Sequence, residues 1–173
     1  MVQLVMLHGL PASGKSTLGM QIVEARPGWV LLKSGAFRKE ESKSWAFDES
    51  DDLVRRQKDE SYRAMLAAAR SLLLEGKSVI LDATFHKRYR REWAYALAQE
   101  CGVSLAVITV GCADDVVSER LMARKGVLGT DAALKSMDEY LLMKRQAEQL
   151  VERSRVFVFN SGVDDVGLLL EKI

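Results

Sequence analysis

The stretch GLPASGKST, residues 9–17, is the part of this sequence that decides the fold. Gly9, Gly14, Lys15 and Ser16 match the pattern G-x-x-x-x-G-K-[ST], the phosphate-binding loop called Walker A or P-loop. In such a loop, backbone N–H groups surround phosphate oxygens, the lysine reaches the β- and γ-phosphates, and the serine hydroxyl holds Mg²⁺. The stretch therefore predicts a nucleotide site with Lys15 on the phosphates and Ser16 as a metal ligand.

The segments on both sides of the loop agree with this interpretation. Residues 2–7 are apolar and β-branched enough for a buried strand, and residues 15–26 have helical spacing. A strand would deliver the loop, and the positive end of the helix dipole would add to the attraction for phosphate. The other residues of the loop that we expect to bind the nucleotide are Ala12, Ser13 and Thr17.

Bulk properties set few limits on function. At 173 residues the chain is most simply one domain, residues 1–173. Its formal net charge of +1 gives no global attraction to nucleic acid or to a membrane surface. No apolar run reaches the length of a membrane span, and the first residues lack the layout of a signal peptide. We therefore expect a cytoplasmic protein that makes no membrane contact.

Apolar runs alternate with helical patterns along the chain. Further strands are predicted at 29–32, 78–84, 103–110 and 156–159. Helices are predicted at 51–75, 88–100, 114–124, 131–153 and 163–173, whereas residues 33–50 have no clear period and are interpreted as loop or irregular helix. Five strands separated by helices predict an α/β fold, a doubly wound domain with a five-stranded parallel sheet.

In that architecture ligands lie at the carboxyl ends of the strands. The segments that follow strands are the P-loop, residues 33–38, residues 82–86, the segment after Val110 and residues 160–162. We therefore expect these five segments to converge on one crevice.

Four sequence blocks follow the P-loop in a fixed order. They are SGAFRKE, GKSVILDATFHKRYRRE, ERLMAR with GTDAALKSMDEYL, and NSGVDDV. With these blocks the chain resembles the small P-loop kinases of the polynucleotide kinase and zeta-toxin type, an AAA-type family of predicted kinases. The resemblance implies a three-layer P-loop NTPase fold with a small helical lid at about 120–133.

The same resemblance implies that ATP and Mg²⁺ are used to move the γ-phosphate to a hydroxyl acceptor. The acceptor stays open between a nucleic-acid 5′-OH, which the net charge does not indicate, a nucleoside and another small molecule. ATP is expected over GTP by default, because no N/T-K-x-D guanine-reading motif is present.

Asp82 ends an apolar strand. A carboxylate there can hold Mg²⁺ through water or orient an acceptor hydroxyl near the γ-phosphate, and the resemblance implies an acceptor role. The alternative is a strand-end aspartate that caps a turn. Thr84 could support Asp82 or touch the acceptor.

Three arginines are candidate catalytic residues. Arg120 and Arg124 lie on one face of a predicted helix, and the resemblance places them on the lid, where they would neutralise charge and exclude water. A solvated helix face is the alternative. Arg38 matches an acceptor-side arginine of the family, although a surface arginine paired with Glu40 or Glu41 would look the same.

Two further segments have weaker signals. The basic stretch HKRYRRE, residues 86–92, is interpreted as a solvated helix face, with an acceptor or phosphate contact as the alternative. His86 is suitably placed for an acceptor site. Asn160 begins the loop after the last strand, and in this fold class that loop usually packs against the nucleotide base.

One position departs from the family pattern. The family usually has an aspartate directly after the serine of SGAFRKE, where it accepts the proton of the acceptor hydroxyl, but this chain has Gly35. Asp82, or a carboxylate at Glu40, Glu41 or Asp48, could orient the acceptor instead. Transfer could also need no base, or it could have been lost by divergence or by an engineered change. The alternative function is therefore an ATP-binding or ATPase module, or a switch, with little or no transfer.

Overall fold

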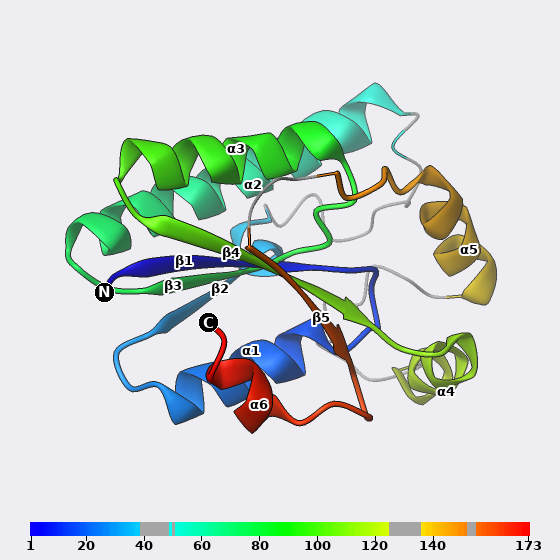
Figure 1. Ribbon diagram of the computed structural model, residues 1–173. Coiled ribbons are helices and arrows are strands. Elements are labelled where there is room, and N and C mark those ends of the chain that lie inside the picture. The colour runs from blue at the N-terminus through cyan, green and yellow to red at the C-terminus, as the bar shows by residue number, and fades with distance from the viewer. Residues whose placement is uncertain (39–48, 50, 125–135, 152–154) are drawn as a thin grey trace.

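Five apolar segments pair into one parallel sheet with helices on both faces (Figure 1). The computed structural model describes residues 1–38, 49, 51–124, 136–151 and 155–173. The strands are β1 (Gln3–His8), β2 (Val30–Lys33), β3 (Val79–Asp82), β4 (Ser104–Gly111) and β5 (Arg155–Asn160), in the order β2-β3-β1-β4-β5. Every neighbouring pair is parallel, which confirms the predicted fold class.

The helices form the two outer layers of the fold. They are α1 (Lys15–Ala25), the 3₁₀ turn η1 (Ser34–Phe37), α2 (Asp52–Leu74), α3 (Arg88–Glu100), α4 (Asp114–Arg124), α5 (Met137–Gln146) and α6 (Val166–Leu170). Helices α2 and α3 cover one face of the sheet, and α1 and α6 cover the other (Figure 1). Helices α4 and α5 pack together beyond the carboxyl end of β4.

The central strand shows why the sheet is buried on both faces. Leu4 and Met6 of β1 belong to the core under α2 and α3, whereas Val5 and Leu7 belong to the core over α1. All four side chains have an exposed fraction of 0%. A strand covered on both faces needs a continuous apolar run, which is the pattern that predicted β1.

The predicted helix over 131–153 is wrong in its second half. Helix α5 ends at Gln146, and residues 147–151 are not helical. The N–H of Glu148 donates to the carbonyl of His86 at 2.9 Å, and Arg91 Nη2 donates to the carbonyl of Gln149 at 2.8 Å. These long-range hydrogen bonds use backbone groups that a helix would pair internally.

The other predicted elements are present with shifted ends. The last helix, predicted at 163–173, spans only Val166–Leu170, and it begins where the Asp165 carboxylate caps two N–H groups. Residues 131–135 and 152–153 of the predicted long helix lie outside the described residues. No helix in the described ranges has both the length and the apolar character needed to cross a membrane.

Candidate active site

The P-loop has a backbone that only glycine can supply at two positions. Gly9 has φ +149° and Gly14 has φ +102°, both in the region that favours glycine. A Cβ on Gly9 would lie 2.3 Å from the carbonyl oxygen of Val110, and one on Gly14 would lie 2.3 Å from Ser161 Oγ. The loop is therefore closed in by the ends of β4 and β5, and its glycines cannot be replaced without displacing those neighbours.

Helix α1 begins directly after this loop. Its N-cap is Gly14, and no side chain of the described residues caps the first turn, which also contains no acidic residue. The first N–H groups of a helix lack intrahelical partners, and together with the helix dipole they attract an anion. The loop and the start of α1 thus have the features of an anion site of the kind that the motif predicts.

Lys15 lies inside the loop rather than in solvent. Its Nζ donates to the carbonyl of Leu10 at 2.7 Å and lies 3.5 Å from Ser13 Oγ, and the residue has an exposed fraction of 7%. The loop's own oxygens therefore hold the ammonium group within the loop.

Ser16 and Asp82 meet at the carboxyl ends of β1 and β3. Ser16 Oγ donates a hydrogen bond of 2.5 Å to Asp82 Oδ2, and Asp82 is buried with an exposed fraction of 6%. The register of the two strands, which pairs Leu7 with Asp82, brings the aspartate beside the loop. The prediction that Asp82 lies at the site agrees with this position.

These two oxygens fit a magnesium ion. Mg²⁺ takes hard oxygen ligands and is usually held by one or two protein groups together with phosphate oxygens and water. Within the described residues, no cluster of three or more His, Cys, Asp or Glu side chains could enclose a metal. Ser16 and Asp82 are therefore the residues that would hold the ion.

Arg120 of α4 contacts the P-loop and the loop that follows β5. Its Nη1 donates to the carbonyl of Ala12 at 2.9 Å, and its Nη2 donates to Ser161 Oγ at 3.0 Å. Arg124 is the last residue of α4, and its side chain lies outside the described part of the chain, as do residues 125–133 of the predicted lid. The structure thus places one of the two predicted lid arginines at the loop.

The residue of the last loop that reaches this site is Ser161; residues 160–162 were predicted at the crevice, but Asn160 was the residue named there. Asn160 is exposed, and its side-chain amide donates to Asp164 Oδ2 at 3.2 Å. The only sequence signal for Ser161 is its place directly after a strand end, which it shares with its neighbours. Thr17, also predicted at the nucleotide, lies exposed in the first turn of α1.

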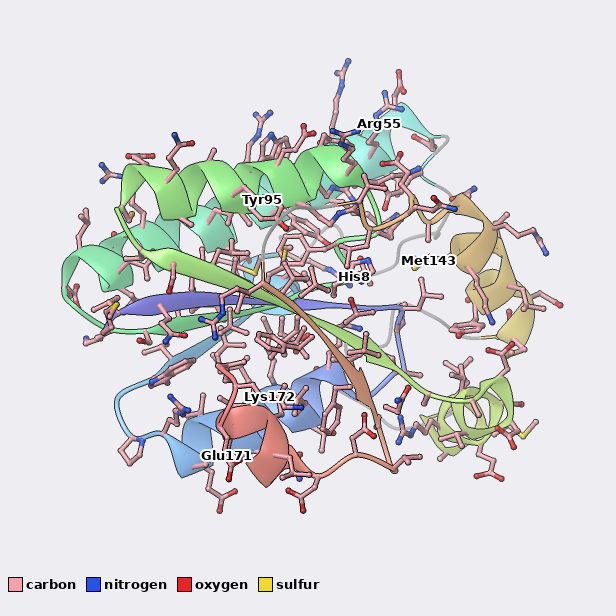
Figure 2. All side chains as sticks on the ribbon, viewed as in Figure 1. His8, Arg55, Tyr95, Met143, Glu171 and Lys172 are labelled. Carbon is pink, nitrogen blue, oxygen red and sulfur yellow. The ribbon has the colours of Figure 1, made fainter. Side chains whose placement is uncertain are left out.

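A small cavity of about 60 Å³ lies beside the P-loop. It is lined by Pro11, Ser34, Arg38, Glu49, Lys58, Ser61, Tyr62, Thr84, Arg90 and Met143. Met143 comes from α5, beyond the carboxyl ends of the strands (Figure 2). Arg38, predicted on the acceptor side, therefore lies at a cavity that shares Pro11 with the phosphate-binding loop. Gly35 lies in η1, and Glu40, Glu41 and Asp48 lie outside the described residues.

The basic stretch 86–92 is solvated only at Arg88 and Glu92, and its other basic residues include three buried ones, which corrects that interpretation. His86, Arg90 and Arg91 have exposed fractions of 2%, 0% and 0%. Arg90 pairs with Glu49 at 2.9 Å and with Asp59 at 2.8 Å. Arg91 donates to backbone carbonyl groups, among them that of Phe85 at 2.9 Å. Buried guanidinium groups are tolerated because acceptors surround them.

Glu49 is the centre of the buried charges and was not predicted. Its Oε1 lies 3.0 Å from Lys58 Nζ and 3.1 Å from His86 Nε2. Burial opposes ionisation of Glu49, but hydrogen bonds from His86 and Arg90 and the charge of Lys58 together lower its pKa well below the usual range. Glu49 is therefore a carboxylate at neutral pH, and burial lowers the pKa of His86 despite this partner.

A family model for the AAA domain matches residues 4–150, from β1 to beyond α5. The chain belongs to the AAA domain family. The matched region of this AAA domain protein contains the P-loop, Asp82, Arg120 and the cavity, and it ends before β5. The family match confirms the resemblance on which the expectations above were based. No curated protein sequence matches the chain.

Solved structures show the same fold along nearly the whole AAA domain protein. A candidate kinase from Chloroflexus aurantiacus is similar with a TM-score of 0.76 at 18% identity, over 99% of this chain and 96% of that one. A sugar kinase from Janibacter sp. has a TM-score of 0.71 at 18% identity, over 99% and 92%. Chaetomium thermophilum Kti12, solved in complex with ADP-AlF3, has a TM-score of 0.70 at 20% identity, over 98% and 96%.

Proposed function

We propose that this protein is an ATP- and Mg²⁺-dependent phosphotransferase that moves the γ-phosphate to a hydroxyl acceptor. One observation carries the proposal. A P-loop whose Lys15 is held by the loop's own oxygens, and whose Ser16 is bonded to the strand-end Asp82, lies beside a separate cavity that Arg38 lines. A kinase needs a site for the donor and a site for the acceptor next to each other.

On the donor side, Lys15 and the backbone N–H groups of residues 9–17 bind the phosphates. Ser16 would hold Mg²⁺ directly, and Asp82 would hold it directly or through water. The ion, when bound, neutralises charge on the β- and γ-phosphates. The Ser16–Asp82 hydrogen bond of 2.5 Å orients both oxygens for this role.

On the lid side, Arg120 and Arg124 stabilise the charge of the transferring phosphoryl group and exclude water. Arg120 supports this role because its two nitrogens already contact Ala12 and Ser161 at the loop. A planar guanidinium can give parallel hydrogen bonds to a phosphoryl group, which a lysine cannot.

On the acceptor side, Arg38 binds the acceptor in the cavity. Lys58 and Arg90 also line the cavity, and Glu49 balances part of their positive charge. The small volume of the cavity, about 60 Å³, favours a small molecule with a hydroxyl group over a nucleic-acid end.

The test measures ADP release from ATP and Mg²⁺ in the presence of a panel of polyols, sugars, sugar acids and nucleosides. The wild-type protein should release ADP faster with at least one acceptor, and Lys15→Ala should abolish that turnover while keeping the fold by circular dichroism. Lys77→Ala, which removes an exposed lysine paired with Glu75, is the matched control. ATP consumption by Lys15→Ala at the wild-type rate would refute the P-loop assignment.

Gly35 favours a second function, an ATP-binding or ATPase module with little transfer. Glycine has no side chain that could take the acceptor's proton where the family has aspartate. In this case the wild-type protein would bind ATP tightly, and ADP release would not depend on any acceptor in the panel.

A further inference from the structure

A chain of four hydrogen bonds runs from the backbone of Phe85 through Thr84 to the buried Glu49. The N–H of Phe85 donates to Tyr62 Oη at 3.1 Å, and Tyr62 Oη lies 3.1 Å from Thr84 Oγ1. Thr84 Oγ1 lies 3.0 Å from His86 Nδ1, and His86 Nε2 lies 3.1 Å from Glu49 Oε1. Each group in the chain is thus linked to the next.

The two ends of the chain fix the direction of every proton in it. A backbone N–H can only donate, so Tyr62 Oη accepts from Phe85, and a carboxylate can only accept, so the proton between His86 and Glu49 is on Nε2. A neutral imidazole then has Nδ1 as an acceptor, which receives the proton of Thr84. Tyr62 donates its own proton to Thr84 Oγ1.

The surroundings keep the imidazole of His86 neutral, with Nδ1 free of a proton. Burial is the main cause of its lowered pKa, and the charges of Arg90 and Lys58 act in the same direction, whereas Glu49 opposes them. His86 is therefore neutral at neutral pH, with a carboxylate in place to stabilise the imidazolium when it forms. Carboxylate, imidazole and hydroxyl in this order activate the nucleophile of serine hydrolases by the same logic.

Thr84 lies where the donor and acceptor sides meet. Its side chain lines the cavity, and its carbonyl oxygen accepts from the N–H of Gly9 in the P-loop at 3.2 Å. A hydroxyl oxygen has two acceptor positions. Tyr62 uses one, and an acceptor hydroxyl in the cavity could donate to the other.

We propose that Thr84 takes the proton of the phosphoryl acceptor and passes its own proton to His86, which Glu49 positions. This inference rests on the proposed function. As the acceptor oxygen forms a bond to the γ-phosphorus, the bond from phosphorus to the ADP oxygen breaks and the acceptor O–H bond breaks. That proton goes to Thr84 Oγ1, and the proton of Thr84 goes to His86 Nδ1. Thr84 is the catalytic residue, and His86 and Glu49 are positioning residues that supply what Gly35 cannot.

The experiment uses water as the acceptor, so that no unidentified ligand is needed. The kcat and KM for ATP hydrolysis are measured for wild type, Thr84→Val, Thr84→Ser and His86→Gln, with nucleotide affinity from a fluorescent ATP analogue. Thr84→Val keeps the shape of the side chain but removes the hydroxyl that passes the proton on. His86→Gln keeps a hydrogen-bonding side chain without a basic nitrogen. Both should lower kcat by about 10²-fold with KM nearly unchanged, the lower end for general acid–base catalysis. Thr84→Ser should retain kcat within about threefold of wild type, on the same scale.

Tyr89→Phe is the matched control for damage to the buried charges. It removes a hydroxyl that donates to Asp59 at 2.8 Å but that lies outside the chain of four hydrogen bonds. Its kcat should equal that of wild type.

The inference is overturned if Thr84→Val and His86→Gln keep kcat within twofold of wild type, if Thr84→Ser loses as much as Thr84→Val, or if Tyr89→Phe loses as much. If Lys15→Ala hydrolyses ATP like wild type, the proposed function fails, and the inference fails with it. If Thr84→Val does not fold, His86→Gln and Thr84→Ser decide.

Discussion

Ser16 and Asp82 lie 66 positions apart in the sequence and are joined by a hydrogen bond of 2.5 Å. The contact links the first turn of α1 to the end of β3, and it exists because β1 and β3 are neighbours in register. A parallel sheet thus brings a hydroxyl and a carboxylate together at the carboxyl ends of its strands, where neither strand alone could place both. The Ser16 hydroxyl and the Asp82 carboxylate are the oxygens on which we base the expected metal dependence.

Asp82→Asn tests that dependence. The amide keeps the size of the side chain but removes the negative charge that a divalent cation needs. We expect the affinity for ATP in the presence of Mg²⁺ to fall about 10- to 100-fold, the range for groups that orient or support a bound metal. Calorimetric titration with and without Mg²⁺ measures the change. Asp115→Asn, on the exposed start of α4, should bind like wild type. Equal Mg²⁺ enhancement in Asp82→Asn and wild type would exclude a role for Asp82 at the ion.

Arg120→Lys tests whether the fork geometry of the arginine matters. Lysine keeps the charge but cannot contact Ala12 and Ser161 with two nitrogens at once, as Arg120 does at 2.9 and 3.0 Å. We expect kcat for ATP turnover to fall at least about 10-fold, with a smaller change in nucleotide affinity. Steady-state kinetics with Arg155→Lys as control gives the comparison, since Arg155 is exposed on β5. A loss of the same size in both variants would contradict the prediction.

Arg90→Met should destabilise the fold, because it breaks a buried ion pair from one side. It leaves Glu49 with less compensation in a site where Arg90 has an exposed fraction of 0%. Removing one partner of such a pair typically costs about 3–5 kcal/mol. Urea unfolding measures the free energy of unfolding.

Arg88→Met, which loses only an exposed pair with Glu92, should cost less than about 1 kcal/mol. The double variant Arg90→Met/Glu49→Leu should lose less stability than the sum of the two single variants, and simple additivity would argue against the pair.

The elements that carry local patterns were predictable from the sequence. The glycines of the P-loop have positive φ angles, and the spacing of the motif alone identifies them. Strand β3 and Asp82 at its end follow from an apolar run with one carboxylate. In each case a local run of residues carries the signal, over a distance that sequence patterns cover.

The buried charges could not be predicted, since their cause is distant in the sequence. Arg90 looks like a solvated residue of an amphipathic helix until Glu49 is placed beside it, and Glu49 lies in a region without periodicity. The early end of α5 has the same origin, because Arg91 binds the carbonyl of Gln149, 58 residues away. Partners at such separations are set by the topology, and local propensity does not report them.

His8 should make the stability of the protein depend on pH. It ends β1 (Figure 2), its Nδ1 is buried without a hydrogen bond within the described residues, and burial and then Arg91, Lys15 and His86 lower its pKa to about 4. Its usual pKa of about 6.5 applies in the unfolded chain, which therefore binds the proton more readily. This contribution to stability is fully present above about pH 6.5 and is lost as the pH falls toward 4.

His8→Gln removes this titration while keeping a polar side chain of similar length. From these pKa values, the wild type should lose about 2 kcal/mol more than the variant between pH 7 and pH 5. Urea unfolding at both pH values gives the difference for each protein. Glu49 and His86, whose pKa values are also lowered, make both proteins less stable in acid, so the comparison between wild type and variant isolates His8. The same loss in both proteins would mean that His8 is charged, or solvated, in the folded state.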